Sequence, residues 1–116
     1  MSERLPAGLE VRGLMRAAEA SGGQAMILAK GDEDRGDILL VLLERGRARF
    51  LLHREASVDG TTRWRVLASA DEADPDFAET LARRRRIDPD CWAAELDFTD
   101  PEPFLGETLD LPPHRR

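Results

Sequence analysis

The amino-acid sequence predicts an α+β domain with a mainly antiparallel sheet of about five strands and two helices. An amphipathic segment near the N-terminus is followed by four short apolar segments separated by turn-forming residues. A second helical segment then precedes one more alternating segment, so the expected order is helix, four strands, helix, strand. We expect a single domain over residues 1–105 and an extended, proline-containing tail over 106–116.

The first helix is predicted over residues 9–21. Apolar side chains recur there at intervals of three and four residues, which gives one apolar face between charged positions. Gly22 and Gly23 end this helix, because glycine adopts the left-handed C-cap conformation without strain. The short apolar segment 24–30 that follows predicts a strand.

Consecutive apolar residues over 38–43 predict a strand in the middle of the sheet. An unbroken apolar run cannot alternate between core and solvent, so it fits a strand covered on both faces. Periodicity alone leaves a buried helical segment as the alternative. Arg45-Gly46 then predicts a tight turn into the next strand, over 47–55.

A second hairpin joins the strands 47–55 and 63–69 through Asp59-Gly60. A two-residue turn would place Arg54 opposite Arg65 and would divide the apolar residues between the two sheet faces. A three-residue loop over 58–60, with Gly60 as a left-handed bulge residue, shifts the pairing by one residue. We therefore predict the bulged loop. It places Glu55 opposite Arg63, and Phe50, Leu52, Trp64, Val66 and Ala68 on one face.

The second helix is predicted to begin at Asp74-Pro75, an N-cap acceptor followed by proline at the first helical position, and to end at Asp88-Pro89. Apolar residues then alternate with small or acidic ones over 92–98, which predicts a half-buried strand. Four prolines after Thr99 predict an extended tail that docks through Phe104 and Leu105.

Composition excludes several classes of function. The net charge is −6, with 23 acidic and 17 basic residues, which argues against a protein that coats nucleic acid with a uniformly basic surface. The one cysteine, Cys91, excludes an internal disulfide and a multi-cysteine zinc site. No apolar run approaches the roughly 20 residues of a membrane span, and no secretory signal begins the sequence. We therefore expect a cytoplasmic protein without membrane association.

The acidic segment 32–37 is the candidate metal site. Asp32, Asp34 and Asp37 supply the oxygen ligands that magnesium and calcium prefer, and they support the alternative of a metal-dependent hydrolase or nuclease. The spacing is not that of an EF-hand, because Gly36 stands at a ligand position and no glutamate follows at the last one. The simpler interpretation is a solvated loop of turn-forming residues.

Arginines supply the candidate binding surfaces, although only Lys30 among the 17 basic residues is lysine, so arginine clusters carry less information here. The arginines at 83–86 point all around a helix and fit a solvated or ion-paired helix end. Nucleic-acid contact through them is an alternative that we do not favour, because no aromatic side chain interleaves them. The candidate binding residues are Arg47, Arg49, Arg65, Arg83, Arg84, Arg86 and Trp92, of which Trp92 is more simply a core residue.

The sequence supports no catalytic residue. A nucleophilic Cys91 requires a base, and the histidines are His53 and His114, the second of which lies in the predicted tail. We expect no cofactor. The leading hypothesis is a non-enzymatic domain that binds a protein partner through the arginine-bearing sheet face or the proline-rich tail, and a homo-oligomer is the other assembly left open.

Three pieces of the sequence carry a family resemblance: Gly31-Asp32, Gly36 before an aliphatic strand, and the stretch over 88–95, Asp-Pro-Asp-Cys-Trp-Ala-Ala-Glu. With the leading amphipathic helix and the length, they resemble a family of small uncharacterised proteins found mainly in alphaproteobacteria, the domain of unknown function family 1491. The resemblance covers residues 5–105. From the resemblance we expect family members to carry an aliphatic residue at the position of Cys91. The resemblance supports the fold and the class of protein, and it implies no activity.

Overall fold

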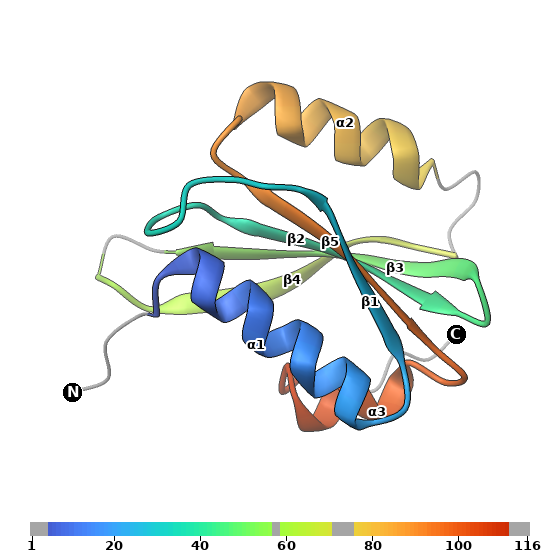
Figure 1. Cartoon of the computed structure of the whole chain (residues 1–116). Coiled ribbons are helices and arrows are strands. Elements are labelled where there is room, and N and C mark those ends of the chain that lie inside the picture. The colour runs from blue at the N-terminus through green and yellow to red at the C-terminus, as the bar shows by residue number, and fades with distance from the viewer. Residues whose placement is uncertain (1–4, 57–58, 71–75, 112–116) are drawn as a thin grey trace.

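The computed structural model describes residues 5–56, 59–70 and 76–111 and confirms the predicted α+β class (Figure 1). In chain order the elements are α1 (Ala7–Ala20), β1 (Gln24–Ala29), β2 (Ile38–Glu44), β3 (Arg47–Ala56), β4 (Thr62–Ser69), α2 (Phe77–Ile87), β5 (Trp92–Phe98) and α3 (Glu102–Glu107). The five strands form one sheet in the order β1-β5-β2-β3-β4. Helices α1 and α3 lie on one face of this sheet and α2 lies on the other.

The sheet is mainly antiparallel, as the sequence predicts. The pairs β1–β5, β2–β3 and β3–β4 are antiparallel, and β2–β5 is the parallel pair. Helix α2 carries the chain from β4, at one edge, back across the sheet to β5. Strand β5 therefore enters between β1 and β2, and β1 becomes the other edge of the sheet.

Strand β2 is the central strand that the apolar run predicts. Each of its residues from Ile38 to Leu43 is at most 9% exposed. Side chains on one face of the strand join the large core beneath α1 and α3, and those on the other face pack under α2. The turn at Arg45-Gly46 is also present, with both residues at positive φ, 52° and 84°.

The second hairpin has the predicted register with one exception. Glu55 pairs with Arg63, Trp64 packs in the same core as Phe50, and Gly60 has a φ of +89°. Residues 57 and 58 of the loop lie outside the described part of the chain. The prediction for Ala68 is wrong: a second bulge at Leu67 reverses the alternation, so Ala68 pairs with Leu51 and packs on the α2 face.

Two predictions about helices are corrected. The N-cap of α2 is Asp76, whose side chain accepts a hydrogen bond from the Glu79 N–H at 3.0 Å, whereas Asp74 and Pro75 lie outside the described residues. The segment after Thr99, expected to be extended, contains the third helix, α3. Proline is compatible with the first turn of a helix, where an N–H group has no intrahelical acceptor, so the prolines at 101 and 103 did not exclude it.

The two faces of the sheet are covered unequally. Under α1 and α3 the core is continuous and includes the fully buried Trp92 and Phe50, with Phe104, Leu105 and Leu109 from the C-terminal segment. On the other face α2 contributes only the partly buried Phe77 and Leu81, and it has no fully buried residue. Within the described ranges, no helix has both the length and the apolar character to cross a lipid bilayer.

Candidate binding surface

The three aspartates of the candidate metal site point to separate partners. The Asp32 carboxylate accepts hydrogen bonds from the backbone N–H groups of Asp34, at 2.9 Å, and Arg35, at 2.8 Å. These bonds, the one from Arg35 first, hold the pKa of Asp32 below its ordinary value. Asp37 Oδ2 lies 3.1 Å from His53 Nε2, and Asp34 is exposed. Over the described residues no three His, Cys, Asp or Glu side chains are placed to hold a metal ion, and these three aspartates do not converge.

The acidic loop is instead packed against the connection between α2 and β5. The N–H of Asp32 donates to the carbonyl of Asp90 at 2.9 Å, and Trp92 Nε1 donates to the carbonyl of Asp32 at 2.6 Å. A Cβ atom at Gly31 or Gly36 would lie 2.0 or 2.1 Å from the Asp90 carbonyl oxygen. The residues that carry the family resemblance therefore meet at one junction, where the loop 31–36 packs against residues 90–92.

The same loop supports the beginning of α1. The carbonyls of Asp34 and Glu33 accept hydrogen bonds from the N–H groups of Ala7 and Gly8, which have no acceptor within the helix. Arg54 is fully buried beside this junction. It lies 3.3 Å from Glu10 Oε1 and donates to the Gly36 carbonyl at 3.2 Å. Because these contacts fix α1, the loop and β3 together, the arrangement is structural.

Trp92 and Cys91 are placed inside the protein. Trp92 is 0% exposed and Cys91 is 2% exposed, so neither side chain presents a surface to a partner. Burial, and after it the charge of Asp88, raises the pKa of the Cys91 thiol to about 12. A thiol with this pKa supplies almost no thiolate at neutral pH, and thiolate is the nucleophilic form.

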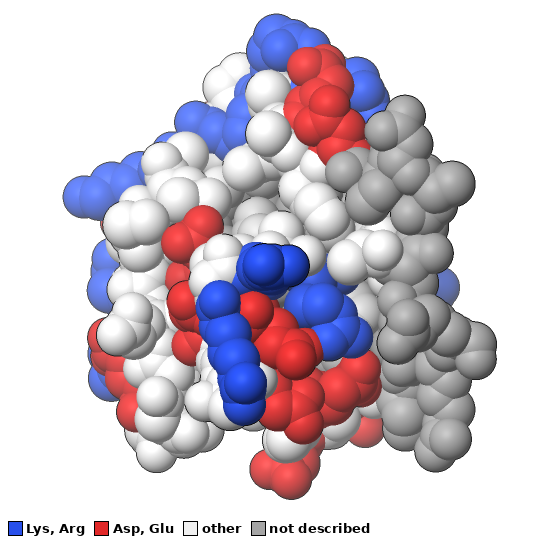
Figure 2. All heavy atoms as spheres, turned by 90° about the vertical axis from the view of Figure 1, so that its right-hand side faces the viewer, with Lys and Arg blue, Asp and Glu red and all other residues white. Residues whose placement is uncertain are grey.

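The candidate arginines are spread over α2, β3 and β4, and several of them pair with neighbouring carboxylates. Arg49 pairs with Glu44 and with Glu102, Arg65 lies 3.6 Å from Glu55, and Arg86 lies 3.5 Å from Glu79. Arg47 and Arg83 are exposed and Arg84 is half-buried. Figure 2 shows basic and acidic side chains intermixed on the face that it presents. Among the described residues of this face, the charges do not form the uniformly positive surface that a phosphate backbone requires.

A surface that the sequence did not reveal lies between α2 and the β1 side of the sheet. We call it the α2–β1 groove. Its volume is about 380 Å³, and Leu28, Val41, Leu43, Ala48, Phe77 and Leu81 form most of its lining, with Glu95 at one side. In Figure 2, uncharged surface separates α2, at the top, from the mixed charges below it. This apolar lining remains accessible because α2 covers the sheet incompletely.

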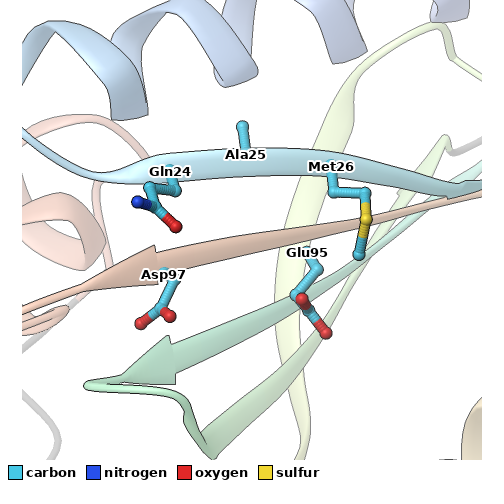
Figure 3. A pocket seen from close by; sticks show the side chains of 5 residues that line it. All are labelled: Gln24, Ala25, Met26, Glu95 and Asp97. Carbon is cyan, nitrogen blue, oxygen red and sulfur yellow. The ribbon is translucent and has the colours of Figure 1, made fainter.

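An acidic recess adjoins the groove through Glu95. The recess has a volume of about 220 Å³ and is lined by Gln24, Ala25, Met26, Glu95 and Asp97. Figure 3 shows Gln24, Met26, Glu95 and Asp97 pointing to one side of the sheet and Ala25 to the other. In the register of the sheet, Met26 pairs with Glu95, and Gln24 pairs with Asp97.

Strand β1 borders both hollows and is an edge of the sheet. It pairs with β5 on one side, and none of the described strands lies on its other side. Its sequence, QAMILA, contains no charge, and Met26 and Leu28 are 52% and 40% exposed. The opposite edge, β4, carries Arg63 and Arg65. Uncharged apolar segments suggest an inner strand, so the sequence alone gave no signal that this one lies at an edge.

Comparisons with known proteins identify the type of domain. The profile of the family described as Protein of unknown function (DUF1491) matches residues 5–106. A solution structure of an A. tumefaciens protein is 26% identical, with a TM-score of 0.76, and covers 97% of this chain and 98% of its own. Two structures of DUF1491 family proteins from Caulobacter crescentus are also similar. The NMR structure is 32% identical, with a TM-score of 0.72, and covers 85% and 90% of the two chains. The crystal structure is 29% identical, with a TM-score of 0.68, and the match covers 84% of this chain and 91% of the Caulobacter chain. No curated protein matches this chain.

Proposed function

The chain belongs to the DUF1491 family of proteins of unknown function, and we propose that it is a non-enzymatic module that binds another protein by taking up an extended segment along β1. One observation carries this proposal. Strand β1 is an uncharged edge strand whose exposed side chains adjoin an apolar groove. Family membership supports the fold and supplies no activity.

The backbone of β1 supports strand addition. An edge strand directs the N–H and C=O groups of alternate residues away from its sheet, where another chain can pair with them. Proteins commonly protect such edges with charged residues, proline or β-bulges. Residues 24–29 contain no charged residue and no proline, and the one irregularity in their pairing with β5 lies between Ile27 and Ala29, near the end of the strand. Backbone pairing would supply affinity, and pockets for alternate side chains would supply specificity.

The side chains around β1 support the same mode of binding. A strand added at this edge extends the α2 face of the sheet beyond Met26 and Leu28. Partner side chains on that face would cover both residues and reach the α2–β1 groove. Burial of apolar surface is the main driving force of such an association.

The proposal places the binding surface at the β1 edge of the sheet and not at the candidate arginines of β3 and β4. Arg49 and Arg65 lie beside carboxylates, so their charge is largely compensated within the protein. Nucleic-acid contact through the arginines of α2 has less support for the same reason, because Arg86 pairs with Glu79 and Arg85 donates to the carbonyls of Pro89 and Cys91.

Selection from a library of short random peptides, displayed on phage, tests this function. An enriched peptide is then synthesised, and its site is mapped from the backbone amide shifts of the ¹⁵N-labelled full chain. We expect the largest shifts in β1, at Gln24–Ala29. No enriched peptide, or peptides that shift only amides elsewhere, would overturn the proposal.

Two matched variants separate the edges of the sheet. Leu28→Lys and Val66→Lys each introduce one charge at an apolar edge-strand residue that is 40% exposed. We expect Leu28→Lys to weaken the mapped peptide on the order of tenfold, because the peptide would have to desolvate the new ammonium group. Val66→Lys, on β4, should leave the affinity unchanged. Equal effects of the two variants would contradict binding at β1.

A further inference from the structure

Resting on this proposed function, we propose that the segment taken up at β1 belongs to a different protein and carries a basic side chain that enters the acidic recess. A neighbouring apolar side chain of the segment, two positions away on the same face, enters the α2–β1 groove.

The first step is the exceptional position of Glu95. Five glutamates among the described residues are half-buried: Glu10, Glu44, Glu55, Glu95 and Glu102. Four of them form ion pairs with Arg54, Arg49 or Arg65. Glu95 makes no ion pair with any described residue, although the chain is rich in arginine. Its carboxylate is thus available to a cation brought by another molecule.

The second step is the chemistry of the recess around Glu95. None of its five lining residues is basic. Asp97 adds a second carboxylate on the same side of β5, about 7 Å along the strand. Its Oδ1 atom accepts a hydrogen bond from the Gly46 N–H at 3.0 Å, which fixes the side chain. A lysine or arginine side chain fits this charge, and an acidic one would be repelled.

The third step is the distance that a side chain of the added strand has to span to reach Glu95. A strand added to β1 lies about 10 Å from β5, because two strand spacings separate them. A lysine or arginine opposite Met26 can place its apolar stem along the Met26 side chain and its charged group near Glu95. The residue two positions away on the same face then lies near Leu28, at the side of the groove that Phe77 and Leu81 line. The preferred segment therefore has a basic and an apolar residue separated by one position.

The fourth step distinguishes a different protein from a second copy of this chain. Strand β1 itself contains no basic residue, and the single lysine of the chain, Lys30, lies one position beyond its end, so a second copy would bring at most this one cation to the edge. Two copies would also approach with a net charge of −6 each. A basic segment of another protein is attracted by that charge.

Variants of the mapped peptide and of the protein test the inference. The basic residue of the peptide is replaced by glutamine, and both peptides are titrated into the full chain and its Glu95→Gln variant. We expect the unmodified chain to bind the basic peptide about tenfold more tightly than the glutamine peptide, and Glu95→Gln to remove this preference. Glu19→Gln, at an exposed position on α1, is the control for the change in net charge. The preference should also decline as salt concentration rises.

A second experiment reverses the charges on both sides, so that the test remains decisive if Glu95→Gln also changes the structure of the protein. Glu95→Lys should reject the basic peptide and bind a version whose basic residue is replaced by glutamate. Peptides that map to β1 without any basic preference would overturn this inference and leave the proposed function standing. The absence of any peptide at β1 would overturn both. Concentration-dependent dimerisation in sedimentation equilibrium that Leu28→Lys abolishes would instead identify a second copy as the occupant and overturn the inference.

Discussion

At the scale of single residues, Gly31 and Gly36 both pack closely against the carbonyl oxygen of Asp90. We predict that Gly36→Ala lowers the free energy of unfolding by about 1–3 kcal/mol. The added Cβ would lie 2.1 Å from the Asp90 oxygen, a backbone atom that cannot rotate away, and 3.0 Å from Trp92 Cδ1. Urea denaturation followed by tryptophan fluorescence measures the change.

Gly13→Ala is the matched control for this prediction. Gly13 lies in the interior of α1, and a Cβ there would meet no atom within 4 Å. Alanine is the better helix former, so this variant should raise the free energy of unfolding by up to about 1 kcal/mol. A similar change in both variants would mean that the contact with Asp90 is not tight in solution.

Single residues also show what the sequence could and could not reveal about the candidate site. The stretch around Asp32 and the stretch around Trp92 were both recognisable from the sequence. Their contact joins residues 60 positions apart, and no local pattern reports it. The Asp32 carboxylate accepts hydrogen bonds from its own turn and the Trp92 indole is buried, and neither arrangement could be predicted from local sequence.

At the scale of elements, α2 is the helix most dependent on its cap, because it has no fully buried residue. We predict that Asp76→Ala destabilises α2 by about 1 kcal/mol, since the Glu79 N–H loses its acceptor. Amide hydrogen exchange in α2 should then accelerate about fivefold relative to exchange in β2. Asp76→Asn retains an acceptor and should exchange like the unmodified protein. Equal acceleration in both variants would show that the carboxylate charge, and not the cap, is responsible.

The elements divide into those set by local patterns and those set by distant contacts. The apolar run of β2 and the register of the second hairpin at Glu55 were predictable, because each follows from side-chain alternation within a few residues. The bulge at Leu67 was not, since it depends on how β4 fits both β3 and the core under α2. Helix α3 was missed because its prolines were assigned to an extended chain, although the first turn of a helix accepts them.

At the scale of the whole molecule, the order of the strands creates the candidate binding surface. Insertion of β5 between β1 and β2 leaves β1 at an edge and brings Glu95 next to Met26. Neither fact is visible in the sequence, where β1 and β5 are far apart and each looks like a partly buried strand. The sequence therefore predicted the fold class and could not predict where the surface lies.

The extent of the packed molecule gives the last prediction. The sequence suggests a domain that ends at residue 105, but Leu109 is only 6% exposed, and Leu111 donates a backbone hydrogen bond to the Leu105 carbonyl at 2.9 Å. A chain shortened to end at Leu105 loses the buried Leu109 side chain and the last two residues of α3. We expect its free energy of unfolding to fall by about 2–5 kcal/mol, the range for removing a buried leucine.

A chain that ends at Leu111 keeps all of these contacts, so it should unfold in urea at the same midpoint as the full chain. Leu109→Ala in the full chain removes the apolar contact and leaves α3 intact. It should lower the free energy of unfolding by at least half as much as shortening the chain to Leu105 does. If the chain ending at Leu105 were as stable as the chain ending at Leu111, the C-terminal segment would add nothing to the core. The boundary expected from the sequence would then stand. The opposite result would make this segment part of the layer beneath the sheet, where it and α1 jointly support the face of β5 opposite Glu95.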